Sequence, residues 1–189
     1  MGKRILHIGV AVVAYIMVFV IGATSSLLHP ACYAYFGTIA PILFAFPYLV
    51  VASEIRTFGA ATILNGLTLV CALVMDEGNA AFIIILIVLT ILSEIIRGVR
   101  GYGSLRGVRL SFIPLALSYY GYAAHWWTAT AATLQDATEE MSADYAVLVE
   151  QVIRNVPMLC VMVLLAIPVA ILGMRLAERV MGRRAATFE

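Results

Sequence analysis

Histidines and aromatic residues gather in two segments of this sequence, SSLLHPACYAYFG and SYYGYAAHWWTAT. Aromatic rings stack on planar ligands, and an imidazole nitrogen binds metal ions such as the iron of haem. One interpretation of the two segments is therefore a ligand-binding site. The candidate ligand-binding residues in them are His29, Tyr33, Tyr35, Tyr119, Tyr122, His125 and Trp126.

The two histidines are the candidate metal ligands of this set. His125 follows Tyr122 by three positions, so both lie on one helical face, which Trp126 continues. His29 precedes Pro30 in a turn that interrupts a helix, so it can project into a cavity and ranks first as a ligand to haem iron. A simpler interpretation is that each histidine bonds a nearby carbonyl or hydroxyl group, and that the tryptophans anchor the chain at the membrane interface.

Six apolar stretches are each long enough to cross a bilayer as a helix. The chain has 189 residues, of which 63% are hydrophobic and 12% are charged, too little polar surface for a soluble globule. A hydrocarbon core about 30 Å thick needs about 20 apolar residues per helix. The sequence therefore predicts an all-α membrane protein, a single domain with six transmembrane helices. The predicted spans are residues 5–27, 31–53, 57–75, 80–99, 109–132 and 153–176.

The basic residues predict which side of the membrane each loop occupies. Eleven of the twelve Lys and Arg residues flank the spans on one side, the side that also holds both termini. Loops rich in Lys and Arg stay in the cytoplasm, so both termini are predicted to be cytoplasmic. Arg154 is the exception and is predicted to lie outside. Its two candidate partners are a carboxylate of a bound ligand and Glu150, one helical turn earlier.

The remaining charged residues narrow the function further. No ionisable side chain lies at the centre of a span, which argues against a proton pump or an ion channel. Glu94 and Arg97 lie one helical turn apart near the cytoplasmic end of the fourth span and are predicted to form an ion pair. In the outer loop, apolar residues from Met141 to Val152 recur at spacings of three and four. This pattern predicts a short amphipathic helix across the outer mouth of the bundle.

The chain lacks the motifs of several function classes. It has no H-E-x-x-H, no G-x-S-x-G and no phosphate-binding loop, so we predict that it is not an enzyme and that any ATP-driven step needs another chain. Its basic residues are membrane flanks rather than a separate basic surface, which argues against a nucleic-acid partner. The sequence predicts no cofactor of the protein's own.

Residues 33–67 (YAYFGTIAPILFAFPYLVVASEIRTFGAATILNGL), the basic turn from Arg97 to Arg109 and the ending LLAIPVAILGMRLAERVMGRR contribute to a whole-chain pattern. The pattern also includes six spans in fewer than 200 residues, an interrupted first outer turn and no nucleotide motif. It resembles the substrate-binding S components of energy-coupling factor (ECF) importers, and more closely their Trep_Strep, or MptD-like, branch. The most specific part runs from Pro41 to Gly59.

The resemblance implies a transport subunit in the bacterial cytoplasmic membrane. S components bind a small nutrient at the outer side and topple in the lipid bilayer to release it inside. The implied partners are a transmembrane coupling subunit and two cytoplasmic ATPase subunits. Small residues on the first helix often contact the coupling subunit. Here the candidates are Gly9, Ala11 and Ala14, without the A-x-x-x-A motif itself.

The family includes members associated with haem uptake, which makes haem the preferred cargo. His29 or His125 would then ligate the iron, aromatic rings would cover the porphyrin, and Arg154 would meet a propionate. Two alternatives stay open. The first is an S component for a vitamin or another aromatic nutrient, such as a flavin or a thiamine-like heterocycle. The second is a membrane haem or quinone redox protein, which normally holds its histidines in pairs on facing helices.

Overall fold

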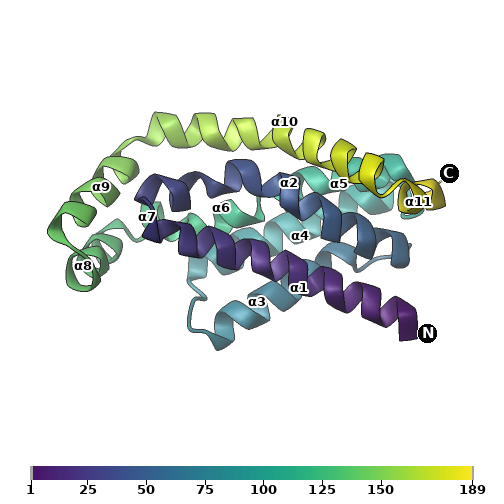
Figure 1. Ribbon diagram of the computed structural model, residues 1–189, viewed down its shortest axis with the longest axis horizontal. Coiled ribbons are helices and arrows are strands. Elements are labelled where there is room, and N and C mark those ends of the chain that lie inside the picture. Colours follow the sequence, from purple (N-terminus) through teal and green to yellow (C-terminus); the bar gives the residue numbers. More distant parts are fainter. Residues whose placement is uncertain (1, 189) are drawn as a thin grey trace.

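The computed structural model describes residues 2–188, apart from the side chain of residue 140, and these residues form helices and no strands. They build an elongated bundle (Figure 1). The long helices are α1 (Gly2–Thr24), α2 (Pro30–Glu54), α4 (Ala80–Arg100) and α10 (Val156–Val180). The shorter elements are η1 (Ser25–Leu27), α3 (Ala60–Val74), α5 (Leu105–Ala116), α6 (Ser118–Ala123), α7 (His125–Thr128), α8 (Thr130–Glu140), α9 (Ala143–Arg154), α11 (Gly182–Ala185) and η2 (Ala186–Phe188). The predicted all-α class is confirmed.

Four helices are long and apolar enough to cross a membrane: α1 continued by η1, α2, α4 and α10. They correspond to the first, second, fourth and sixth predicted spans. The third predicted span contains α3, which has 15 residues, fewer than the roughly 20 that a crossing helix usually needs. The fifth predicted span is not one helix, because it is divided among α5, α6, α7 and the start of α8.

The division of the fifth predicted span begins at a proline. Pro114 has no N–H group, so the carbonyl of Leu110 loses its partner in the helical ladder. Three residues later, the N–H of Leu117 bonds the carbonyl of Pro114 at 3.1 Å, and α5 ends. Helices α5 and α6 both pack against α4. The interrupted segment therefore still follows a long helix of the bundle.

Both termini lie at one end of the bundle, and α8 and α9 lie at the other (Figure 1). We call these the terminal end and the loop end. At the terminal end, the carboxylate of Glu54 accepts hydrogen bonds from His7 and Arg184, each at 2.9 Å. Arg4 donates to the backbone carbonyl of the same residue. Glu54 thus joins the first and last helices to the end of α2.

Helix α2 is the central helix, packed against both α1 and α10. Helix α10 lies close against it at Gly173. A Cβ atom there would lie 2.8 Å from the carbonyl oxygen of Pro41 and 2.9 Å from the Cα of Ile42. Because both neighbours are backbone atoms, they cannot move aside easily, and only glycine fits this crossing.

Glu94, on α4, caps the N-terminus of α3. Its side chain is buried, and Oε1 accepts hydrogen bonds from the N–H groups of Gly59, Ala61 and Thr62 at 3.1, 2.8 and 3.2 Å. The first N–H groups of a helix lack partners within the helix and carry partial positive charge. A carboxylate at this position satisfies them and favours the start of α3.

Arg97, one turn after Glu94, caps the C-terminus of α2. It is 1% exposed, and its guanidinium donates to the carbonyls of Ala52 and Ile55 at 2.8 and 2.5 Å. Within residues 2–188, no ion pair joins it to Glu94. The predicted pair does not form, because each charge satisfies the end of a different helix instead.

A buried polar network fixes the short helix α3 against three others. Asn65 accepts a hydrogen bond from the hydroxyl of Tyr15 on α1 at 2.7 Å. Its amide donates to Thr90 on α4 at 2.8 Å and to Ser118 on α6 at 3.1 Å. Polar groups in an apolar environment are costly unless they are paired. These bonds therefore specify where α3 packs.

We expect Arg97→Met to lower the free energy of unfolding by roughly 2–4 kcal/mol, because it leaves the carbonyls of Ala52 and Ile55 buried without a partner. Unfolding in mixed detergent micelles, followed by circular dichroism, measures the change. Arg100→Met is the control, since the side chain of Arg100 is exposed and forms no hydrogen bond within the described residues. Equal losses in the two variants would contradict the proposed role of Arg97.

A second pair of variants tests the crossing of α2 and α10. Gly173→Ala should destabilise the protein, because its methyl group would collide with the backbone at Pro41 and Ile42. Gly66→Ala should stabilise it by about 0.5–1 kcal/mol, because an added Cβ on α3 meets nothing within 4 Å and alanine favours a helix. The same unfolding measurement applies, and changes of the same sign would refute the close approach.

Candidate functional site

A column of packed aromatic rings runs through the core and ends at the loop end of the bundle. Successive ring centroids lie between 4.4 and 6.2 Å apart. Such contacts stabilise a core by about 0.5–1.5 kcal/mol per pair beyond the burial of their area. In order from the interior, the aromatic column consists of Tyr15, Phe44, Phe19, Tyr119, Tyr33 and Trp126.

A cavity of about 370 Å³ lies where the aromatic column ends. We call it the loop-end cavity. Its volume falls near the lower limit of small-molecule sites, which span about 300–1,000 Å³. Residues from α1, η1, α2, α6, α7, α8 and α9 surround it, so several distant parts of the sequence meet there. The lining residues are Ala23, Ser26, Tyr33, Glu77, Tyr122, His125, Trp126, Thr133, Asp136, Ala137, Met141, Tyr145 and Val149.

Four aromatic side chains form one wall of the loop-end cavity. Tyr33 and Trp126 are buried and stacked, with ring centroids 4.7 Å apart and planes inclined by 29°. Tyr122 and His125 are half-buried, with centroids 5.9 and 6.1 Å from that of Tyr33. Tyr33 is therefore the ring around which the other three pack.

His125 presents a free ring nitrogen. Its Nδ1 lies 2.9 Å from the carbonyl oxygen of Tyr122. A carbonyl only accepts hydrogen bonds, so Nδ1 carries the hydrogen, and Nε2 of the neutral ring is an acceptor. Nε2 has no hydrogen-bond partner in the part of the chain that the structure describes. It is therefore available to a donor group of a ligand or to a metal ion.

The polar lining is acidic. Glu77, in the loop between α3 and α4, accepts a hydrogen bond from the hydroxyl of Tyr122 at 3.2 Å. Asp136, on α8, also lines the cavity, and both residues are exposed. No Lys or Arg is among the lining residues. The cavity thus combines a buried aromatic wall with carboxylates that reach solvent.

The structure brings together four of the predicted site residues, Tyr33, Tyr122, His125 and Trp126, around the loop-end cavity. Tyr119 is fully buried behind them, with its ring 6.2 Å from that of Tyr33 and 5.9 Å from that of Tyr122. The proximity of the two sequence segments is thus observed. Ligand binding by these residues stays a prediction.

The other predicted site residues do not line the cavity. His29 is exposed, and its Nδ1 accepts a hydrogen bond from the N–H of Ala31 at 3.1 Å, which caps α2. Tyr35 also lies outside the lining. Arg154 donates two hydrogen bonds to Glu150, at 2.9 and 2.6 Å, and its side chain is 78% exposed. The pair of Arg154 with Glu150 is the simpler of the two sequence interpretations of that residue. The bond from a histidine to a nearby carbonyl is observed for His125, whereas His29 bonds a backbone N–H group.

Sequence reasoning missed Glu77, Asp136 and Tyr145 as lining residues. Tyr145 belonged to the predicted amphipathic helix, so its apolar spacing was a usable signal. The helix begins after Met141, because Ser142 caps α9 by accepting a hydrogen bond from the N–H of Tyr145 at 3.3 Å. Glu77 and Asp136 carry no local signal, since only the folding of separate elements brings them to one cavity.

Tyr145 connects α9 across the cavity to the end of α1. Its hydroxyl donates to the carbonyl of Ser26, in η1, at 2.9 Å. Burial raises the pKa of this hydroxyl, so it stays protonated and able to donate at neutral pH. Helix α9 is therefore held over the cavity by a specific bond in addition to apolar contacts at Val149 and Val152.

No cluster of three or more His, Cys, Asp or Glu side chains with metal-site geometry occurs within residues 2–188. His125 is the one histidine that lines the loop-end cavity. His125 would therefore be the nitrogen ligand of a metal bound there.

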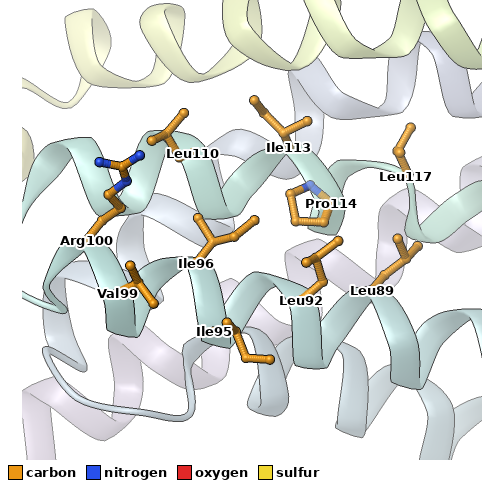
Figure 2. Close-up of a pocket in the computed structure, with 10 residues that line it drawn as sticks. All are labelled: Leu89, Leu92, Ile95, Ile96, Val99, Arg100, Leu110, Ile113, Pro114 and Leu117. Atoms are coloured by element: carbon orange, nitrogen blue, oxygen red, sulfur yellow. The ribbon is translucent and has the colours of Figure 1, made fainter.

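A larger hollow, of about 540 Å³, lies between α4 and α5 (Figure 2). Its lining is apolar except for Arg100 at one end, and it includes Leu89, Leu92, Ile113 and Pro114. A groove without convergent polar groups suits lipid chains better than a nutrient. The loop-end cavity, although smaller, is therefore the better candidate for a specific site.

A comparison with known protein families agrees with the apolar helices described above. A family model described as "Hypothetical bacterial integral membrane protein (Trep_Strep)" matches residues 2–184. The chain belongs to the Trep_Strep family. It is accordingly a bacterial integral membrane protein, with several apolar helices able to span a membrane. No curated protein and no solved structure is similar enough to match the chain.

We expect Tyr145→Phe to loosen α9 from η1. Loss of one hydrogen bond costs about 0.5–1.5 kcal/mol, so amide hydrogen exchange in α9 should accelerate by roughly 2- to 13-fold while exchange in α2 and α10 stays unchanged. Tyr35→Phe is the control, since its hydroxyl forms no hydrogen bond within the described residues. Unchanged exchange in α9 would show that apolar packing alone holds it.

Proposed function

We propose that this Trep_Strep protein is the substrate-binding subunit of an ECF-type importer. In this proposal the loop-end cavity faces the outside and takes a small aromatic nutrient, and ATP hydrolysis belongs to two partner ATPases rather than to this chain. The observation that carries the proposal is the aromatic cavity at the end of the bundle opposite both termini. A membrane protein with a cavity at one face that is lined by aromatic and polar side chains is suited to capture a solute there.

The proposed topology has six crossings with both termini in the cytoplasm. Glu54 lies at the terminal end, while Glu77 lines the loop-end cavity. The segment between them, which contains α3, therefore covers the length of the bundle. The same holds for the segment from Arg97, which bonds the end of α2 beside Glu54, to His125, and this segment contains α5 and α6. One short crossing and one interrupted crossing added to four long helices give the even number that places both termini together.

Haem is supported less well as the cargo than a smaller aromatic nutrient. His125 offers Nε2 to an iron ion, but His29 caps α2 and Arg154 pairs with Glu150, so neither reaches the cavity. The two propionates of haem would meet the carboxylates of Glu77 and Asp136. The vitamin-like alternative from the sequence is therefore our preferred cargo class.

The proposed contact with the coupling subunit lies on the exposed face of α1. Gly9 and Ala14 are exposed, and a Cβ added at Gly9 would meet nothing within 4 Å. Ala11 is 4% exposed and packs inside the bundle, so it is removed from the proposed contact. Small residues on an open helix face permit close approach of a second membrane helix.

The redox alternative has less support. A protein that carries electrons through haem would hold its iron between paired histidines on facing helices. His125 has no second histidine beside it in the cavity lining, and His7 lies at the terminal end with Glu54. We therefore propose binding and transport rather than electron transfer.

Purification of the tagged protein from its native membranes tests the proposal. Mass spectrometry should detect a coupling subunit, two ATPases and a small aromatic compound. Ala14→Leu should reduce recovery of the coupling subunit at least about tenfold, because a bulky side chain blocks close helix packing, while the small compound stays bound. Cys160→Leu, at an exposed position on α10, is the matched control and should change neither. Absence of ATPases and coupling subunit from the unmodified complex would refute the importer role.

A further inference from the structure

We infer that the ligand of the loop-end cavity is a small aromatic cation. This inference rests on the proposed binding function and adds the charge and hydrogen-bonding character of the substrate. Three separate features of the lining agree on it: the carboxylates, the aromatic faces and the polarity of the free hydrogen-bonding atoms.

The carboxylates give the cavity a negative potential. Glu77 comes from the loop between α3 and α4, and Asp136 comes from α8, so two separate segments deliver negative charge to one cavity. No lining cation compensates them. Arg154, on the same end of the bundle, is already engaged with Glu150. An anionic ligand would be repelled here, whereas a cation would be attracted.

The aromatic wall favours the same charge. The face of a tyrosine or tryptophan ring attracts a cation within about 6 Å of its centre, and rings gathered around a site form the usual cage for quaternary ammonium groups. Tyr33, Tyr122 and Trp126 come from α2, α6 and α7 and converge on the cavity. Tyr33 and Trp126 stack on each other and are buried, whereas Tyr122 is half-buried and is the ring of the three most open to a cation.

The free polar atoms of the wall are mainly acceptors. Nε2 of His125 accepts when the ring is neutral, because Nδ1 is occupied by the carbonyl of Tyr122. The hydroxyl hydrogen of Tyr122 is directed to Glu77, and that of Tyr145 to Ser26. These two hydroxyls therefore cannot donate to a ligand without breaking an existing bond. A ligand with N–H donors matches the wall better than one rich in acceptors.

Two isosteric compounds test the charge directly. Trimethylphenylammonium and tert-butylbenzene have nearly the same shape, but only the first is charged. Titration into the purified full-length protein, followed by tryptophan fluorescence, gives both affinities. We expect the cation to bind about tenfold more tightly than the neutral compound, since a partly desolvated cation on aromatic faces gains about this much.

Variants of the carboxylates assign the preference to the cavity. Glu77→Gln and Asp136→Asn should each reduce the ratio of the two affinities by about threefold or more, because they remove charge and keep the shape of the side chain. Asp144→Asn is the matched control. It removes an exposed carboxylate at the start of α9 that does not line the cavity, and it should leave the ratio unchanged.

Three results would overturn the inference. They are equal affinity for the two compounds, a preference for the cation that survives both cavity variants, and binding of neither compound. In Ala137→Trp a bulky side chain fills the cavity. If both compounds bind the unmodified protein equally and neither binds this variant, the ligand is not selected for positive charge, but binding at this site is still supported. Recovery of the coupling subunit tests the importer role independently of these titrations.

Discussion

The turn between α2 and α3 depends on two opposite charges placed one helical turn apart on α4. Glu94 satisfies the N–H groups that begin α3, and Arg97 satisfies the carbonyls that end α2. Near a membrane, helix ends that are not paired are costly, so these bonds hold three helices in one arrangement. Once α3 is fixed, Asn65 can join α1, α4 and α6 in the interior, and the loop that carries Glu77 reaches the opposite end of the bundle.

The interior between those two ends is mainly apolar and aromatic, and the polar groups of the Asn65 network pair with one another, which determines where recognition can occur. The aromatic column fills the core and leaves its last rings, Tyr33 and Trp126, facing a cavity instead of another helix. The polar groups of the cavity come from elements around the core: Asp136 from α8, Tyr145 from α9 and Glu77 from the loop between α3 and α4. The wall is thus part of the stable core, while its cover is attached by few bonds, including that of Tyr145 to Ser26. Such a division favours a rigid binding surface under a cover that can open.

Much of this arrangement could be predicted from residue patterns, and the failures have physical causes. Hydrophobic length located four membrane helices, because that signal lies within each segment. It did not reveal the breaks near Pro114 and Ala124, since a broken helix in a bundle has the same composition as a continuous one. Aromatic clustering identified Tyr33, Tyr122, His125 and Trp126 as neighbours. The turn before Pro30 suggested that His29 projects into a cavity, whereas its side chain caps α2 and lies outside the cavity lining.

The distribution of charge links the orientation of the protein to the chemistry of its cavity. Positive residues concentrate at the terminal end, where they pair with Glu54 and Glu178 or flank the helices. This asymmetry is what predicts a cytoplasmic location for that end, and it also removes cations from the loop end. Arg154 is the exception, and Glu150 already neutralises it. A cavity formed at the loop end therefore has carboxylates without a nearby counter-charge. Since isolated negative charges beside a buried aromatic wall are stabilised by a bound cation, the same bias that orients the chain favours a positively charged ligand.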